Sequence, residues 1–173
     1  MKKGFLFLIS CLCTVMMTAC SGRDAQIITT EDAIADGEWQ CFRKEFTLLS
    51  AGGASLKIAA DTKYWLWVNG ELVVREGGLK RGPNPTDSYC DVFDQVPNLK
   101  AGRNTVALLV QYYGKNSFSH APSAVPGIWF ELNTRFGKVV SDKSWKGVRY
   151  DAFGLRQTKI LTDHVNTDSQ ELM

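Results

Sequence analysis

The sequence predicts an all-β protein, built as a β-sandwich or a jelly roll. From Trp39 onward, apolar and polar residues alternate with a period of two, which is the spacing of a strand with one buried face. Turn signals such as Asn69-Gly70 separate these short alternating segments, and no segment shows sustained helical periodicity. Several short strands joined by regularly spaced turns are typical of a sandwich or a jelly roll.

The predicted strands follow one another along the chain. In the first, Phe42, Lys44, Phe46 and Leu48 share one face. Asn69-Gly70 supplies the positive φ angles of a type I′ turn and therefore joins the strands on either side in a hairpin. The longest apolar segment has two apolar faces, which indicates a central strand. After the first strand, the segments are Leu56–Ala60, Tyr64–Val68, Glu71–Val74, Tyr89–Asp94, Thr105–Tyr113, Gly127–Leu132 and Lys138–Val140.

Residues 1–19 have the composition of a signal peptide. Lys2-Lys3 precedes the apolar run Phe5–Met17, which is too short for a permanent membrane span and predicts a cleaved signal helix. The end of this segment, Met17-Thr18-Ala19-Cys20, resembles the bacterial lipoprotein box, which implies that Cys20 is acylated. The alternative is an ordinary cleaved signal with an incidental cysteine. We therefore expect an exported chain, lipid-anchored in the cell envelope at the outer membrane or the periplasmic face, with residues 20–36 as a polar tether.

The charge balance argues against a nucleic-acid partner. The chain has 20 Lys+Arg and 18 Asp+Glu, and removal of Lys2 and Lys3 with the signal leaves 18 of each. A neutral chain lacks the basic footprint of a nucleic-acid-binding protein, and it suits uncharged ligands such as sugars.

Two cysteines, Cys41 and Cys90, remain after the signal peptide and Cys20. They form either a disulfide, which export would permit, or two part-buried thiols. The histidines are only His120 and His164, and no Cys/His spacing of a zinc site is present. We therefore expect no metal and no cofactor.

Several short sequence motifs occur in an order that resembles the N-terminal β-sandwich module of bacterial α-L-rhamnosidases and related glycoside hydrolases. The likeness covers residues 39–150, and it implies a galactose-binding-like sandwich. The motifs are Trp39–Phe46 (WQCFRKEF), Tyr64–Glu71 (YWLWVNGE), Gly82-Pro83, Asp91–Asp94, Leu99–Leu108 (LKAGRNTVAL) and Ser141–Trp145 (SDKSW).

The resemblance also implies what this chain lacks. In that family the module precedes a helical (α/α)₆ barrel that carries two catalytic carboxylates. The barrel hydrolyses the glycosidic bond with inversion of the anomeric configuration. The sequence stops at Met173, before such a barrel would begin, and none of its acids matches a family catalytic position. We therefore expect this chain to be the non-catalytic module of a glycoside hydrolase, and to have no hydrolase activity on its own. Its expected partners are a following catalytic domain, the membrane through the lipid, and a rhamnose-containing glycan through the parent enzyme.

Flat aromatic rings are the candidates to hold a sugar, with nearby polar groups taking its hydroxyls. Trp129 alternates with core residues and therefore points away from the core. Trp65 and Trp67 either bind sugar or cover the outer sheet face against a neighbouring module, and His120 is either a ligand contact or a loop hydrogen-bonder. The candidate residues are Trp129, Trp65, Trp67, Tyr113, Asn116 and His120.

Three interpretations of the chain stay open. It is the front module of a lipid-anchored rhamnosidase-like enzyme, a freestanding carbohydrate-binding lipoprotein, or a purely structural docking module. The sandwich is expected over residues 37–150. Residues 151–173 lose the β alternation and are predicted to be an irregular tail, as a linker or the start of a truncated domain. This tail favours the first interpretation.

Overall fold

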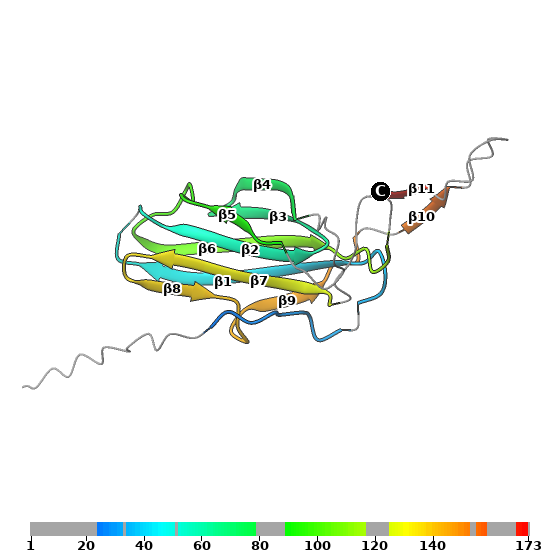
Figure 1. Ribbon diagram of the computed structural model, residues 1–173, viewed down its shortest axis with the longest axis horizontal. Helices are drawn as coiled ribbons and strands as arrows, with labels where there is room; N and C mark the ends of the chain where they lie inside the picture. Colours follow the sequence, from blue (N-terminus) through cyan, green and yellow to red (C-terminus); the bar gives the residue numbers. More distant parts are fainter. Residues whose placement is uncertain are drawn as a thin grey trace, which may run out of the picture.

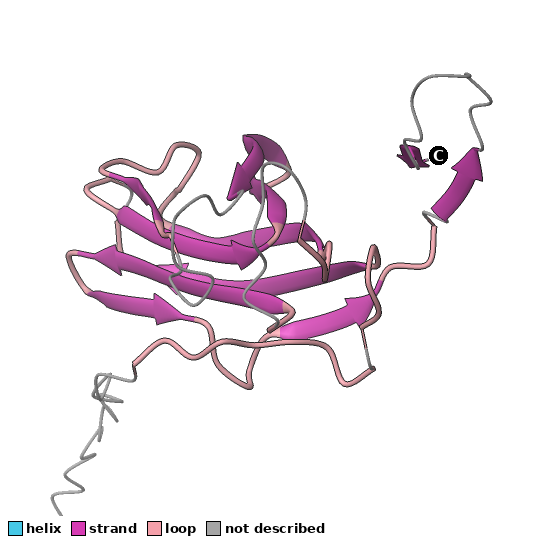
Figure 2. Ribbon diagram, turned by 45° about the vertical axis from the view of Figure 1, so that its right-hand side comes forward, coloured by secondary structure: helices cyan, strands magenta, loops and turns pink. Residues whose placement is uncertain are grey.

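The computed structural model describes residues 24–32, 34–50, 52–78, 89–116, 125–152, 155–158 and 169–172. The predicted signal helix, Cys20 and His120 lie outside them. The described part of the chain contains strands and loops (Figure 2), and it has no helix long and apolar enough to cross a membrane. The strands are β1 (Trp39–Leu48), β2 (Ser55–Asp61), β3 (Lys63–Val68), β4 (Glu71–Gly78), β5 (Asp91–Phe93), β6 (Gly102–Gln111), β7 (Gly127–Thr134), β8 (Gly137–Val140), β9 (Lys146–Arg149), β10 (Leu155–Thr158) and β11 (Ser169–Leu172).

The strands form a two-layered antiparallel sandwich, which confirms the predicted fold class (Figure 1). One sheet has five strands in the order β4-β3-β6-β1-β9, and the other has four in the order β5-β2-β7-β8. β6 pairs with β1 on one side and with β3 on the other, as expected for a strand with two apolar faces. Every strand predicted from the alternation is present.

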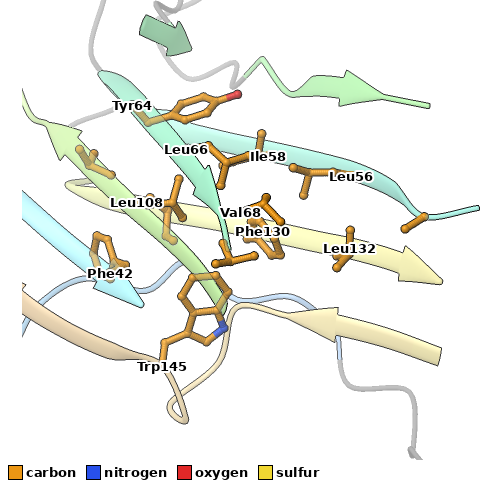
Figure 3. Packing of buried hydrophobic residues seen from close by; sticks show 14 residues of the cluster. Phe42, Leu56, Ile58, Tyr64, Leu66, Val68, Leu108, Phe130, Leu132 and Trp145 are labelled. Carbon is orange, nitrogen blue, oxygen red and sulfur yellow. The ribbon is translucent and has the colours of Figure 1, made fainter. Parts of the chain in front are cut away.

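The core lies between the two sheets, where side chains from both inner faces meet (Figure 3). Tyr64 and Leu66 from the five-stranded sheet and Leu132 from the four-stranded sheet are fully buried. The rings of Phe130 and Trp145 meet edge to face with centroids 5.0 Å apart. Trp145 also donates its indole N–H to the Val140 carbonyl at 2.8 Å, so it anchors the loop before β9.

Two asparagines of the family-like motifs hold the loop that leads into β6. Asn69 and Gly70 have φ angles of 53° and 89°, which confirms the predicted hairpin turn. The Asn69 side chain donates to Asn104 Oδ1 at 2.9 Å and accepts from the Thr105 amide at 2.9 Å. The fully buried Asn104 accepts from the Lys100 amide at 2.9 Å and donates to the Lys100 carbonyl at 2.7 Å. These residues are therefore structural, since they satisfy buried backbone groups.

The predicted tether differs from the structure, because residues 24–30 are packed against the sandwich. We call this segment the N-terminal strap; it runs along the lower edge in Figure 1. Ile28 exchanges two backbone hydrogen bonds with Ile128, at 2.9 and 3.0 Å, and so extends the four-stranded sheet beside β7. The Thr30 amide then donates to Gln40 on β1 at 3.2 Å. The strap therefore joins the two sheets, since it satisfies polar groups on both.

Three short strands were not predicted. β9 pairs with β1 over four residues and closes one edge of the five-stranded sheet. β10 and β11 pair with each other within the segment for which irregular structure was expected. The sequence of β9, Lys-Gly-Val-Arg, has a single large apolar residue and is too short to show a period, so only pairing with β1 reveals it.

Candidate functional site

Trp129 stands on the outer face of the four-stranded sheet, on β7. Its neighbours Ile128 and Phe130 are each 1% exposed and face the core, so Trp129 faces away from it, as predicted. The residue opposite Trp129 on β2 is Ala59. Because a methyl group is small, it leaves room beside the indole for a ring-shaped ligand.

A groove with a volume of about 400 Å³ opens beside this indole, and we call it the Trp129 groove. Its size falls in the range of small-ligand sites, which are mostly apolar with a few polar groups. Among the described lining residues, the charged ones are Lys57 and Asp61. The lining comprises Ile27, Lys57, Ala59, Ala60, Asp61, Gly78, Tyr89, Cys90, Val125, Gly127, Ile128 and Trp129.

The N-terminal strap fixes the position of Trp129. The indole Nε1 donates to the Ala25 carbonyl at 3.1 Å, which holds the ring in one orientation. Close approach of the strap requires glycine at position 127, where φ is 136° and a Cβ would overlap the Ile28 carbonyl oxygen. The segment predicted to be a tether is therefore one wall of the groove.

A polar strip lies beside Trp129 on the same sheet face. Glu131, two residues along β7, faces Lys57 on β2 and contacts Lys138 Nζ on β8 at 3.3 Å. Asn133 donates to the other Glu131 oxygen at 3.0 Å. This hydrogen bond and the Lys138 ammonium hold the pKa of Glu131 below its usual range, against the effect of burial. An ionised carboxylate paired with Lys138 therefore lies two residues along β7 from Trp129, with Lys57 opposite it on β2.

One carboxylate oxygen ties three strands together at the end of the groove. Asp91 Oδ2 on β5 accepts from the Tyr64 hydroxyl at 2.7 Å and from the Gly78 amide at 2.9 Å. Burial, and then the hydrogen bond to Asp91, raise the pKa of Tyr64 far above its usual value. The phenol therefore stays protonated as a donor, and Asp91 serves to lock the groove end in place.

The two cysteines are free thiols, so of the two alternatives that the sequence left open the disulfide is not formed. Cys41 is half-buried and lies on β1 of the five-stranded sheet, facing outward between inward-facing neighbours. Cys90 is exposed in the Trp129 groove beside the other sheet. The core separates the two sheets by about 10 Å, which is too far for a disulfide.

Trp65 and Trp67 lie on the outer face of the five-stranded sheet, as predicted. The strand register aligns Trp65, Leu109, Cys41 and Val148 in one row across four strands. This row lies beside a shallow groove of about 510 Å³, which Trp67, Leu109 and Val148 help to line. The face is therefore apolar across its centre.

Lys63 joins two of the predicted aromatic residues at one end of this face. Its Nζ lies 5.6 Å from the ring centroid of Trp65 and 5.5 Å from that of Tyr113, which is cation–π distance. The same Nζ lies 3.7 Å from Glu76 Oε1. Trp65 also packs against Trp39 with centroids 5.2 Å apart. Trp65 is thus held on two sides.

The structure separates the predicted sugar-binding residues into two groups. Trp65, Trp67 and Tyr113 belong to the five-stranded sheet and the segment after β6, whereas Trp129 belongs to the other sheet. Asn116 is exposed in the loop after β6, and His120 lies outside the described residues.

Sequence reasoning missed the partners of Trp129 in the groove. Lys57 and Ala59 alternate with buried residues of β2, so the sequence alone could predict that their side chains point outward. Their position beside Trp129 depends on the pairing of β2 with β7, which no local pattern contains. Tyr89 and Val125 reach the groove from the ends of the two long segments between strands.

The described residues offer no cluster of three or more His, Cys, Asp or Glu side chains that could hold a metal ion. Within the described groove lining, Asp61 is the one carboxylate, and its Oδ1 accepts from the Thr62 hydroxyl at 3.0 Å. The arrangement is suited to contact a ring through apolar and aromatic surface and to bond its hydroxyls through few polar groups.

No protein-family model and no curated protein sequence matches the chain. Among solved structures, it is similar to a GH78 family rhamnosidase from Bacillus sp. GL1, with 30% identity and a TM-score of 0.59. That alignment covers 74% of this chain and 14% of the rhamnosidase. The chain is also similar to the Pleurotus ostreatus lectin, with 26% identity, a TM-score of 0.50, and coverage of 73% of this chain and 35% of the lectin.

An α-L-rhamnosidase from Streptomyces avermitilis, solved with L-rhamnose, shares the fold at 23% identity and a TM-score of 0.52. The alignment covers 74% of this chain and 12% of that enzyme. The chain therefore spans about a seventh or less of the rhamnosidases and about a third of the lectin. The predicted resemblance to the rhamnosidase sandwich is confirmed at the level of structure: this chain is similar to one part of a rhamnosidase and to part of a lectin.

Proposed function

We propose that this chain is a non-catalytic, carbohydrate-binding module that acts in glycan degradation together with a rhamnosidase-like catalytic domain. The observation that carries the proposal is the similarity to the Bacillus rhamnosidase, at 30% identity over 74% of this chain but only 14% of that one. The expected ligand is a rhamnose-containing glycan. Catalysis would belong to a helical barrel beyond this sandwich.

The sugar is assigned to the Trp129 groove. One face of a pyranose ring carries C–H groups, which stack on the indole, and the apolar lining excludes water from that contact. The Lys57 ammonium and the Asp61 carboxylate line the same groove and can bond hydroxyl groups. Since the strap holds the indole in place before the ligand arrives, little ordering is needed on binding.

Binding rather than cleavage follows from the carboxylates of the groove. An inverting glycosidase places two carboxyl groups about 6.5–9.5 Å apart, one on each side of the scissile bond. The described lining residues include one carboxylate, that of Asp61, and not a pair. Glu131, the nearest acid along β7, is engaged by Lys138 and Asn133 and kept ionised, which does not suit a general acid.

Export and a lipid anchor at Cys20 are part of the proposal. They are supported by the signal-like residues 1–19 and the Met17-Thr18-Ala19-Cys20 sequence. Mass spectrometry of the mature N-terminal peptide tests the acylation. We expect Cys20→Ser to move the chain from the membrane fraction to the soluble fraction.

Titration with rhamnose-containing oligosaccharides, followed by calorimetry, tests the binding function. We expect Trp129→Ala to weaken binding at least tenfold, because it removes the stacking surface. Trp67→Ala is the matched control, since Trp67 is also a half-buried, outward-facing tryptophan but lies on the opposite sheet. Binding that is lost with Trp67→Ala and kept with Trp129→Ala would move the site to the other face. Absence of binding to every such glycan would refute the function.

A second candidate function is docking against a neighbouring domain through the outer face of the five-stranded sheet. The row of Trp65, Leu109, Cys41 and Val148 favours it, because Val148 is 58% exposed at the edge of an apolar strip. Co-purification with a separately expressed catalytic domain, compared between the wild-type chain and Trp67→Lys, tests this candidate.

A further inference from the structure

Large apolar side chains are exposed around the Trp129 groove. Ile27, Tyr89 and Val125 line it and are 58%, 54% and 47% exposed. Val92 on β5 is 59% exposed and shares this sheet face, because it lies opposite the groove residue Lys57. An exposed patch of this kind indicates a surface that meets another apolar phase.

The strap brings the start of the chain to this same face. Ala25 accepts the hydrogen bond of Trp129, and the Gln26 amide donates to the Ser141 carbonyl at 2.9 Å. Ser141 Oγ donates in return to the Gln26 carbonyl at 2.5 Å. The strap is thus tied to the four-stranded sheet from its second described residue onward.

The chain between Cys20 and this tied segment is short. Ala25 is the fifth residue after Cys20, with four residues between them, and an extended chain spans at most about 3.6 Å per residue step. A lipid on Cys20 would therefore hold Ala25 within about 18 Å of the anchored residue. Since Trp129 contacts Ala25, the groove lies within the same reach, whereas the outer face of the five-stranded sheet lies a whole sandwich thickness further away.

We propose that the outer face of the four-stranded sheet rests on the lipid surface that holds the anchor. Ile27, Tyr89, Val92 and Val125 contact the interfacial region, where apolar and tyrosine side chains are favoured. The Trp129 groove then opens at the membrane surface, and its ligand is a glycan carried by that membrane or held close to it. This inference rests on the lipid anchor of the proposed function, and it adds an orientation and a source of ligand.

The test compares one probe position on each outer face. Val92 and Val148 are 59% and 58% exposed valines on the four-stranded and five-stranded sheets, so they are matched in exposure and secondary structure. Val92→Cys and Val148→Cys are each made in the full chain with Cys41→Ser and Cys90→Ser. Each variant is labelled with a nitrobenzoxadiazole fluorophore and incorporated into vesicles of phosphatidylethanolamine and phosphatidylglycerol.

We expect iodide to quench the label at position 92 several-fold less than the label at position 148, with a blue-shifted emission at position 92. The same labels in the Cys20→Ser background, free in solution, should be quenched equally. Equal quenching in the anchored chain, or protection at position 148 instead, overturns the orientation.

Two further measurements separate this inference from the proposed function. Mass spectrometry showing no acyl group on Cys20 would overturn the anchor and the orientation together, while leaving sugar binding in the Trp129 groove intact. Loss of all glycan binding in calorimetry, with position 92 still protected on vesicles, would refute the carbohydrate function and retain the lipid-facing surface. Protection at position 92 together with glycan binding supports both.

Discussion

Replacing Asn104 by alanine should lower the stability of the sandwich by about 2–4 kcal/mol. The amide is fully buried and makes four hydrogen bonds. It accepts from the Lys100 amide and from Asn69, each at 2.9 Å, and donates to the carbonyls of Lys100 at 2.7 Å and Gly102 at 2.9 Å. Each hydrogen bond contributes a net stabilisation of about 0.5–1.5 kcal/mol. In the alanine variant, the polar groups of Asn69, Lys100 and Gly102 also lose the hydrogen bonds that offset their desolvation.

Urea unfolding, followed by tryptophan fluorescence, measures the effect. A domain of this size loses about 2 kcal/mol per molar urea, so the unfolding midpoint should fall by about 1–2 M. Asn133→Ala is the matched control, because the described hydrogen bond of its side chain is a single one to Glu131 on the sheet surface. We expect that control to shift stability by no more than about 0.5 kcal/mol. Equal midpoints for the two variants would refute a structural role for Asn104.

Two other perturbations test the groove end and the strap. In Tyr64→Phe, loss of the hydrogen bond to Asp91 should cost about 1–3 kcal/mol at neutral pH. Since the folded protein keeps the Tyr64 proton above its ordinary pKa, whereas the unfolded chain loses it near pH 10, wild-type stability should fall by about 1.4 kcal/mol per pH unit above pH 10. Denaturation at pH 8–11 should therefore show the stability difference from Tyr64→Phe shrinking as pH rises, and a constant difference would contradict this linkage. Gly127→Ala should detach the strap, because the new Cβ overlaps the Ile28 carbonyl, and hydrogen exchange at the Ile28 and Ile128 amides should accelerate at least tenfold. Unchanged exchange there would show that the strap does not depend on Gly127.

Much of the sandwich could be predicted because its information is local. The alternation in β3 puts Leu66 and Val68 inward and Trp67 outward whatever the partner strand is. The Asn69-Gly70 turn likewise follows from the φ angles that these two residues tolerate. These features depend on neighbours within a few residues, so a single sequence contains them.

The strap was not predictable in this way, because its packing depends on distant residues. Ile28 has no alternating segment around it, and it joins the sheet only because β8 ends at Val140 and leaves the edge of β7 open beside Ile128. The separation of Cys41 from Cys90 was unpredictable for the same reason. The strand order places them beside different sheets, and this order is not visible in the local sequence. A local sequence pattern predicts neither the order of the strands in a sheet nor which strand edge stays unpaired.

The sequence by itself determined the all-β class, the hairpin, and the outward direction of Trp65, Trp67 and Trp129, since side-chain direction in a strand needs only a period of two. It also contained the motifs that make this chain similar to a part of a rhamnosidase. Only the tertiary structure decided that Trp129 lies on the other sheet from Trp65 and Trp67, in one groove with Lys57. It also decided that a hydrogen bond to the Ala25 carbonyl orients the Trp129 indole. The reason is physical: a ligand groove is made by residues from different strands, and only the pairing of those strands brings their side chains together.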